Sequence, residues 1–159
     1  EIFHLNPLFG ICGYVCGLCE KPCNRREVDS HIHIRFVERF IFDWYRDQVN
    51  KGELPPYRPI NKKAANGKKV AIVGGGPAGL SASFFLAQEG YGVHLFEAKS
   101  RLGGALRLIP SFRLPDDVLD FAIDQIITPL EITVHYNTAP SIASLKNEYD
   151  AILVSTGTH

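Results

Sequence analysis

An apolar block, a glycine-rich turn and a second apolar block predict a strand–helix–strand unit in the middle of the chain. Residues 69–73 form a strand-like run that ends in four apolar residues, and three consecutive glycines follow directly. The uncharged stretch 78–88 has the length of a helix that Gly90 would end, and residues 92–96 form the next strand-like run. We therefore expect a βαβ unit here.

Three later segments extend this pattern. Residues 116–127 carry apolar side chains at helical spacing, and residues 131–135 form a short strand-like run. Residues 151–154 are apolar throughout, as is usual for a parallel strand that is buried on both faces. Alternating strands and helices predict the α/β fold class, with a Rossmann-like domain built on parallel strands.

The preceding part of the chain predicts a smaller helical region. Residues 34–49 place apolar side chains at helical spacing between charged ones, which predicts an amphipathic helix with one apolar face for a partner. Residues 1–30 show several turn residues and little periodicity, and residues 51–68 are rich in proline, glycine, asparagine and lysine. We expect a helical domain over 1–50, an exposed linker over 51–68 and a dinucleotide-binding domain over 69–159.

Composition and charge exclude several classes of protein. The chain has 159 residues, of which 45% are apolar, as is typical of a globular protein. Its 17 basic and 17 acidic residues give a formal net charge of zero, so it has no electrostatic footprint for nucleic acid. Residues 70–88 lack charge, but three glycines and Pro77 would break a membrane-spanning helix. The first six residues lack a leader pattern, and we expect a cytoplasmic protein without a membrane span.

The glycine-rich turn carries the fingerprint G-x-G-x-x-G after a strand and before a helix. Gly74 permits the sharp turn, Gly76 lets the backbone approach a pyrophosphate, and Gly79 allows the helix to pack closely against the strand. Pro77 suits the first helical position, and with Ala78 it opens a helix whose free N–H groups attract an anion. The turn therefore predicts a site for a flavin or nicotinamide dinucleotide.

Glu97 ends the second strand, where a carboxylate would accept hydrogen bonds from both ribose hydroxyls of the dinucleotide. The same charge would repel a 2′-phosphate, which disfavours NADP at this turn. The alternative for Glu97 is a solvated acid at a strand end.

All four cysteines fall within one short segment, with the spacing C-x3-C-x2-C-x3-C at Cys12, Cys16, Cys19 and Cys23. Short staggered spacing beside a proline suits an iron–sulfur cluster. Structural zinc usually pairs two C-x2-C groups with a longer insert, and disulfides would imply an oxidising compartment. We expect iron–sulfur ligands, with zinc and free or disulfide-bonded thiols as alternatives. Because Pro22 precedes the last cysteine, the bacterial ferredoxin signature is not met.

The order of these motifs resembles a known family. The segments N-P-L-F-G-I-C-G-Y-V-C, L-C-E-K-P-C-N-R and I-R-F-V-E-R-F resemble the iron–sulfur domain of the glutamate synthase small subunit family. That family includes the flavin-binding half of dihydropyrimidine dehydrogenase and the large subunit of bifurcating ferredoxin:NADP reductases. The likeness continues through V-A-I-V-G-G-G-P-A-G-L-S-A, F-E-A and L-G-G-A-L-R-L-I-P-S-F-R-L-P, and it ends at Y-D-A-I-L-V-S-T-G-T-H.

The resemblance implies that FAD is the dinucleotide and lies across the first βαβ unit. Four residues would then line the flavin side of the pocket and two would close over it: Leu102, Gly103, Gly104 and Arg107, then Thr156 and Gly157. The alternatives are an ordinary turn at the glycine pair and a solvated surface charge at the arginine.

The resemblance also implies [4Fe-4S] clusters. Cys16 and Cys19 would serve one cluster and Cys23 another, whereas Cys12 need not take part. Glu38 occupies the position of a helix residue that ligates in some members, with an ordinary exposed acid as the alternative. The family's upstream cysteine group and its NAD(P)H-binding domain are absent, so we expect this chain to be part of a longer polypeptide. The short loop between the second and third cysteines leaves the number of clusters open.

The resemblance therefore implies an FAD- and iron–sulfur-dependent NAD(P)H oxidoreductase. In the complete protein, hydride would pass between NAD(P)H and FAD, and single electrons would pass through the clusters to other subunits of a redox complex. No catalytic side chain is required for this chemistry. Ser81, Ser83 and Ser155 lack the context of a nucleophile, and we expect His31 and His33 at a solvated edge rather than as metal ligands.

Two other functions fit the same sequence. The first is an NAD-binding redox domain without flavin, in which the cysteines hold structural zinc. The second is a non-enzymatic fragment, whose amphipathic helix over residues 34–49 docks into a larger assembly.

Overall fold

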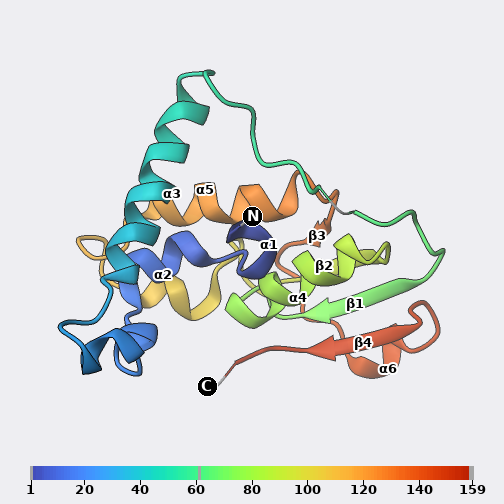
Figure 1. Cartoon of the computed structure of the whole chain (residues 1–159). Helices are drawn as coiled ribbons and strands as arrows, with labels where there is room; N and C mark the ends of the chain where they lie inside the picture. The colour runs from blue at the N-terminus through green and yellow to red at the C-terminus, as the bar shows by residue number, and fades with distance from the viewer. Residues whose placement is uncertain (1, 61, 158–159) are drawn as a thin grey trace. The chain divides into compact units, whose positions relative to one another are not determined.

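The computed structural model describes residues 2–60 and 62–157, which form two compact units (Figure 1). Unit 1 runs to Pro56 and includes Pro110–Ala122, while unit 2 comprises Tyr57–Ile109 and the chain from Ile123. The stretch 110–122 therefore joins the helical unit, although it lies within the domain expected over 69–159.

Unit 2 is built on a Rossmann-like sheet of four parallel strands in the order β3-β2-β1-β4. Its elements are β1 (Lys69–Val73), α4 (Pro77–Gln88), β2 (Gly92–Phe96), η3 (Gly104–Leu108), β3 (Thr133–His135), α6 (Ile142–Leu145) and β4 (Ala151–Val154). In the centre of the sheet, Ile72 is paired with Leu95 on one side and with Leu153 on the other. Figure 1 shows β1 and β4 side by side. The expected α/β class is confirmed.

The two faces of this sheet bury different residues because side chains alternate along a strand. On one face, Ala71 packs in a cluster with Leu145 of α6. The alternate residue, Ile72, is fully buried toward α4, which contributes the fully buried Leu80 and Phe84. Each such aliphatic or aromatic side chain stabilises the fold by about 1.5–3 kcal/mol relative to an exposed one.

The last strand-like run before the C-terminal strand is shorter than the sequence predicts. The prediction was a strand over 131–135, but β3 begins only at Thr133. Glu131 has a φ of 56°, and this left-handed conformation cannot continue a strand.

Residues 51–60 and 62–68 contain no helix or strand and are mostly exposed, as expected for a connector. Their backbone is nevertheless fixed to the end of α4. Lys63 donates its N–H to the carbonyl of Gln88, and Asn66 donates to the carbonyl of Gly90.

Unit 1 is helical in its described residues. Its elements are α1 (Ile2–Leu5), α2 (Phe9–Val15), η1 (Leu18–Glu20), η2 (Asn24–Glu27), α3 (Ile34–Asn50) and the first part of α5 (Asp116–Ile127). Helix α3 begins at the predicted residue. Helix α2 was not predicted, because seven residues are too few for a clear periodicity.

Helices α2 and α3 approach closely because two residues of α2 lack a side chain. A Cβ on Gly10 would overlap the ring of Phe42, which is fully buried. A Cβ on Gly13 would lie 2.6 Å from the backbone nitrogen of Arg39. The backbone of α2 therefore lies against the backbone of α3 at Gly13, and Gly10 leaves room for the Phe42 ring.

Helix α3 is amphipathic, as predicted, and much of its apolar face stays exposed in the structure. The exposed apolar side chains of this helix are Ile34, Phe36, Val37, Phe40 and Trp44. Across the part of the chain that the structure describes, none of the helices has the length and apolarity needed to cross a membrane.

Candidate functional site

The glycine-rich turn lies at the carboxyl end of β1, where two of its glycines make contacts that no other residue could make. Gly74 has a φ of 109°, and a Cβ there would overlap the carbonyl oxygen of Ser155. A Cβ on Gly79 would overlap the carbonyl oxygen of Gly74. The turn and the start of α4 are therefore packed backbone to backbone, as the fingerprint predicts.

Gly76 differs from these two glycines because its surroundings are open. Its φ of −78° suits any residue, and the only atom near an added Cβ would be the Cα of Gly104 at 3.9 Å. Gly76 is also the N-cap of α4, and Pro77 takes the first position of that helix. An anion could approach the backbone here, at the positive end of the helix.

The second glycine pair lies against the first turn. Gly103 donates its N–H to the carbonyl of Gly75 at 2.8 Å. A Cβ on Gly104, whose φ is 50°, would lie only 2.8 Å from the Cα of Gly76. This close approach gives the pair a defined structural role beyond that of an ordinary turn, since it forms one wall beside the open face of Gly76.

Glu97 is positioned by two backbone groups. It is 8% exposed, and its Oε2 accepts the N–H of Gly75 at 2.9 Å. Its Oε1 accepts the N–H of Lys99 at 2.9 Å. Each carboxylate oxygen has a further lone pair, so the group could still accept hydrogen bonds from hydroxyls.

Ser155 reaches the same turn from the end of β4. Its Oγ donates to the carbonyl oxygen of Gly74 at 2.9 Å and to that of Val73 at 3.2 Å. From the sequence, Ser155 stands out only as a serine without the context of a nucleophile, so this role is not predicted. The signal was its place after the last parallel strand, because the carboxyl ends of neighbouring parallel strands meet at one edge.

The remaining predicted cofactor residues lie around this edge. Leu102 is buried. Its side chain packs against Gly75, where an added Cβ would overlap it. Arg107 donates from Nε to the carbonyl oxygen of Leu102 at 2.9 Å, which holds the guanidinium beside the glycine pair. Thr156 lies beside the glycine-rich turn, since its Cα would be 3.0 Å from a Cβ on Gly74. The next residue, Gly157, has a φ of 80°.

The four cysteines belong to unit 1, and none of them forms a disulfide. Cys12 lies in α2, Cys16 follows that helix, Cys19 lies in η1 and Cys23 precedes η2. Cys19 is exposed and the other three are partly buried. Within the described residues, no three of these sulfurs lie within 4.8 Å of one another.

Their surroundings act on the thiols in opposite directions. The N–H of Ile32 lies 3.5 Å from the Sγ of Cys23, and hydrogen bonds from this N–H and from the backbone of Arg25 lower the pKa of that thiol. Burial raises the pKa of Cys12, and the negative charge of Glu38 adds to the rise. Burial also raises the pKa of Cys19, and the charge of Glu38 again adds to the rise. Glu38 is therefore close enough for its charge to act on both thiols, and its role as a ligand stays a prediction.

Comparison with known proteins finds one matching family and several similar proteins. Residues 72–134 match the family described as NAD(P)-binding Rossmann-like domain. The chain is 39% identical over 176 residues to the NADP(+)-dependent formate dehydrogenase subunit beta of Moorella thermoacetica, covering 96% of this chain and 24% of that protein. It is 38% identical over 159 residues to the NAD-dependent dihydropyrimidine dehydrogenase subunit PreT of Salmonella typhimurium, covering 96% of this chain and 37% of that protein.

Among solved structures, the histamine dehydrogenase from Rhizobium sp. 4-9 is similar, with 30% identity and a TM-score of 0.51 over 65% of this chain and 17% of that one. The predicted family resemblance is therefore confirmed as a match to part of longer proteins. The chain joins an N-terminal helical region with four cysteines to a Rossmann-like domain in which residues 72–134 match the NAD(P)-binding family, and it is similar to part of two longer oxidoreductase subunits, formate dehydrogenase subunit beta and PreT.

Proposed function

We propose that the chain is the electron-transfer part of a larger NAD(P)H oxidoreductase, with FAD at the glycine-rich turn and [4Fe-4S] iron–sulfur ligation at the cysteines. When bound, the flavin would convert a two-electron hydride transfer into single electrons that a cluster can carry. The observation that supports this proposal best is the carboxyl edge of the sheet, where an oriented buried acid lies beside an open glycine backbone.

At this edge, the residues of unit 2 would divide the dinucleotide between them. Gly76 and the first turn of α4, with Ala78 and Gly79, would hold the pyrophosphate through unpaired N–H groups. Glu97 would accept the ribose hydroxyls, since Gly75 already holds its carboxylate in place. The flavin end would extend over the glycine pair that follows Leu102.

Arg107 would act at the flavin end, because its guanidinium is held close to the glycine pair. Thr156 and Gly157 would close over the cofactor from the end of β4. Ser155 would act as a positioning residue, because it fixes the carbonyl groups of the turn without facing the open side of Gly76.

In unit 1, Cys16, Cys19 and Cys23 would supply thiolates, with Cys12 and Glu38 as further ligands. Hydrogen bonds from backbone N–H groups to cysteine sulfurs are one of the means by which proteins tune such clusters. The bond from Ile32 to Cys23 is of this kind.

Electron transfer of this kind needs partners that this chain does not contain. The two relatives compared above are both named as subunits. The formate dehydrogenase subunit is named as dependent on NADP(+), and PreT as dependent on NAD. We propose that NAD(P)H binds elsewhere in the complete protein and that electrons leave to another subunit. Oxygen-sensitive iron–sulfur chemistry also favours a cytoplasmic location.

A second candidate is that the turn binds NAD(P) directly and the cysteines hold zinc. The family description of residues 72–134 favours this reading of the turn, since it names NAD(P). Both candidates use the same pyrophosphate site, so the identity of the bound dinucleotide separates them.

The test is to purify the chain anaerobically and to measure its absorption spectrum, its released nucleotide, and its iron, sulfide and zinc. The matched variants are Gly76→Ala and Gly92→Ala. Neither glycine has a strained φ, and an added Cβ would meet no atom closer than 3.6 Å at either position, so both variants should fold. Only the Gly76 variant places a methyl group where the pyrophosphate would approach.

The proposal expects flavin bands with a broad iron–sulfur shoulder, and loss of flavin in the Gly76 variant alone. A colourless protein that releases NAD(H) and contains zinc would support the second candidate instead. Flavin retained equally in both variants would move the dinucleotide away from this turn.

A further inference from the structure

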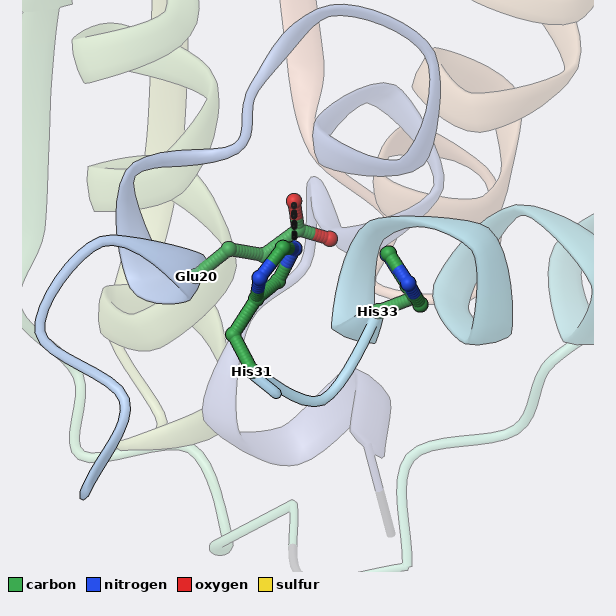
Figure 2. A group of neighbouring side chains, drawn as sticks. All are labelled: Glu20, His31 and His33. Atoms are coloured by element: carbon green, nitrogen blue, oxygen red, sulfur yellow. Dashed lines mark ion pairs between the residues drawn. The ribbon is translucent and has the colours of Figure 1, made fainter. Parts of the chain in front are cut away.

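Three side chains with metal-binding atoms meet in unit 1 beside the cysteines (Figure 2). Glu20 ends η1, while His31 and His33 lie in the segment that leads into α3. One ligand atom from each lies within 4.8 Å of the other two. Glu20 Oε2 and His31 Nε2 are 3.6 Å apart, which Figure 2 marks with a dashed line.

We propose that Glu20, His31 and His33 form a binding site for a divalent first-row transition metal such as Zn²⁺, separate from any metal held by the cysteines. Two imidazoles and one carboxylate are a ligand set that such metals favour, and three protein ligands leave a position for water. This proposal is independent of the electron-transfer function. It also revises the expectation that the two histidines only occupy a solvated edge.

The spacing of the ligand atoms is close to what a metal requires. Nitrogen and oxygen ligands about 2.1 Å from a tetrahedral metal lie about 3.4 Å from one another. The pair formed by Glu20 and His31 already has nearly this separation. His33 is exposed, and its ring lies edge-on to the rings of His31 and Phe36, with centroids 4.5 and 5.9 Å away. To close the remaining distance to a metal, this ring would have to turn relative to those two neighbours.

Outer contacts hold the ligands in place before any metal binds. The N–H of Arg35 donates to Glu20 Oε1 at 3.1 Å, which leaves Oε2 for the metal. The N–H of Ile32, the residue between the two histidines, points at the sulfur of Cys23. Such second contacts orient metal ligands and raise affinity.

A metal here would connect η1 to the start of α3. The intervening residues 21–30 include Cys23 and η2, so the metal would close this segment into a loop. A ligand that binds only the folded state stabilises it by an amount that grows with the logarithm of the ligand concentration relative to Kd. We therefore expect the site to brace the cysteine segment.

The experiment titrates the full 159-residue chain with Zn²⁺ by calorimetry and with Co²⁺ by absorption spectroscopy. The test variant is His31→Gln with His33→Gln. The control is His94→Gln with His135→Gln, because this second histidine pair in unit 2 has ring nitrogens 3.1 Å apart and could also attract metal. A third variant replaces all four cysteines by serine. Circular dichroism and thermal melting check that each protein folds.

The proposal expects a Zn²⁺ site that the test variant weakens by more than about tenfold, since even changes around metal ligands cost 10–100-fold in affinity. The control and cysteine variants should retain this site, and Zn²⁺ should raise the melting temperature only where the site is intact. Bound Co²⁺ should lack the charge-transfer absorption that thiolate ligands produce.

Three results would overturn the proposal: no Zn²⁺ binding by the wild-type chain, equal binding in the test variant, or loss of the site in the control. Thiolate charge-transfer absorption for the whole of the bound Co²⁺ would assign the metal to the cysteines. That spectrum also decides the question if the cysteine variant does not fold.

Discussion

The carboxylate of Glu97 accepts the backbone N–H of Gly75 at 2.9 Å, and this bond joins the end of β2 to the turn that follows β1. The other carboxylate oxygen accepts the N–H of Lys99. A single buried side chain therefore satisfies backbone donors from two loops at the edge where a dinucleotide would bind.

Replacing Glu97 should lower the free energy of unfolding as well as weaken the proposed binding of the dinucleotide. Glu97→Ala leaves the buried N–H of Gly75 without this acceptor, and a buried unsatisfied group costs about 1–3 kcal/mol. The N–H of Lys99, an exposed residue, can bond water instead. Glu97→Gln keeps one acceptor oxygen and should lose less. Urea unfolding of the two variants measures the difference, and equal losses would contradict the structure.

Gly79→Ala tests the contact between α4 and the turn. Alanine is favoured over glycine within a helix by about 1 kcal/mol, but the new Cβ would overlap the carbonyl oxygen of Gly74. Overpacking against backbone costs about 1–3 kcal/mol, so the net effect should be destabilising. Chemical denaturation measures it, with Gly92→Ala as the control because its Cβ would make only ordinary contacts.

Gly13→Ala makes the corresponding test in unit 1. The added Cβ would lie 2.6 Å from the backbone nitrogen of Arg39, so α2 and α3 would have to separate. The matched control is Gly17→Ala, where the nearest atom would be Glu20 Oε2 at 3.7 Å. We expect a lower melting temperature and altered reactivity of the cysteines for Gly13→Ala alone. A Gly13 variant as stable as the control would contradict this close packing.

Tyr14 should make the stability of unit 1 depend on pH in the alkaline range. Burial and a 2.5 Å hydrogen bond to Asp43 Oδ1 raise the pKa of this phenol from 10.0 to about 12. Because the folded state favours the protonated phenol, its contribution to stability is complete below pH 10 and is lost as the pH rises toward 12. Tyrosinate absorbance should show a component that titrates near pH 12 and disappears in Tyr14→Phe, while the raised pKa of Tyr149 is unaffected by that substitution. A titration unchanged by that substitution would refute the assignment.

The sequence alone determined the order and type of the main elements. The strand at 69–73, the glycine fingerprint, the strand at 92–96 and the helix beginning at Ile34 all agree with the structure. These features are local, because they depend only on residues that are close together in the sequence. This holds for the periods of two and 3.6 residues and for the conformation of a glycine turn. A seven-residue helix such as α2 is too short to show such a period.

Only the tertiary structure decided which distant residues meet. Ser155 contacts Gly74 across 81 positions because β4 lies beside β1 in the sheet. Glu20 meets His31 and His33 because the chain turns back between η1 and α3. These contacts depend on strand order and on the packing of one segment against another, and no local pattern records that choice.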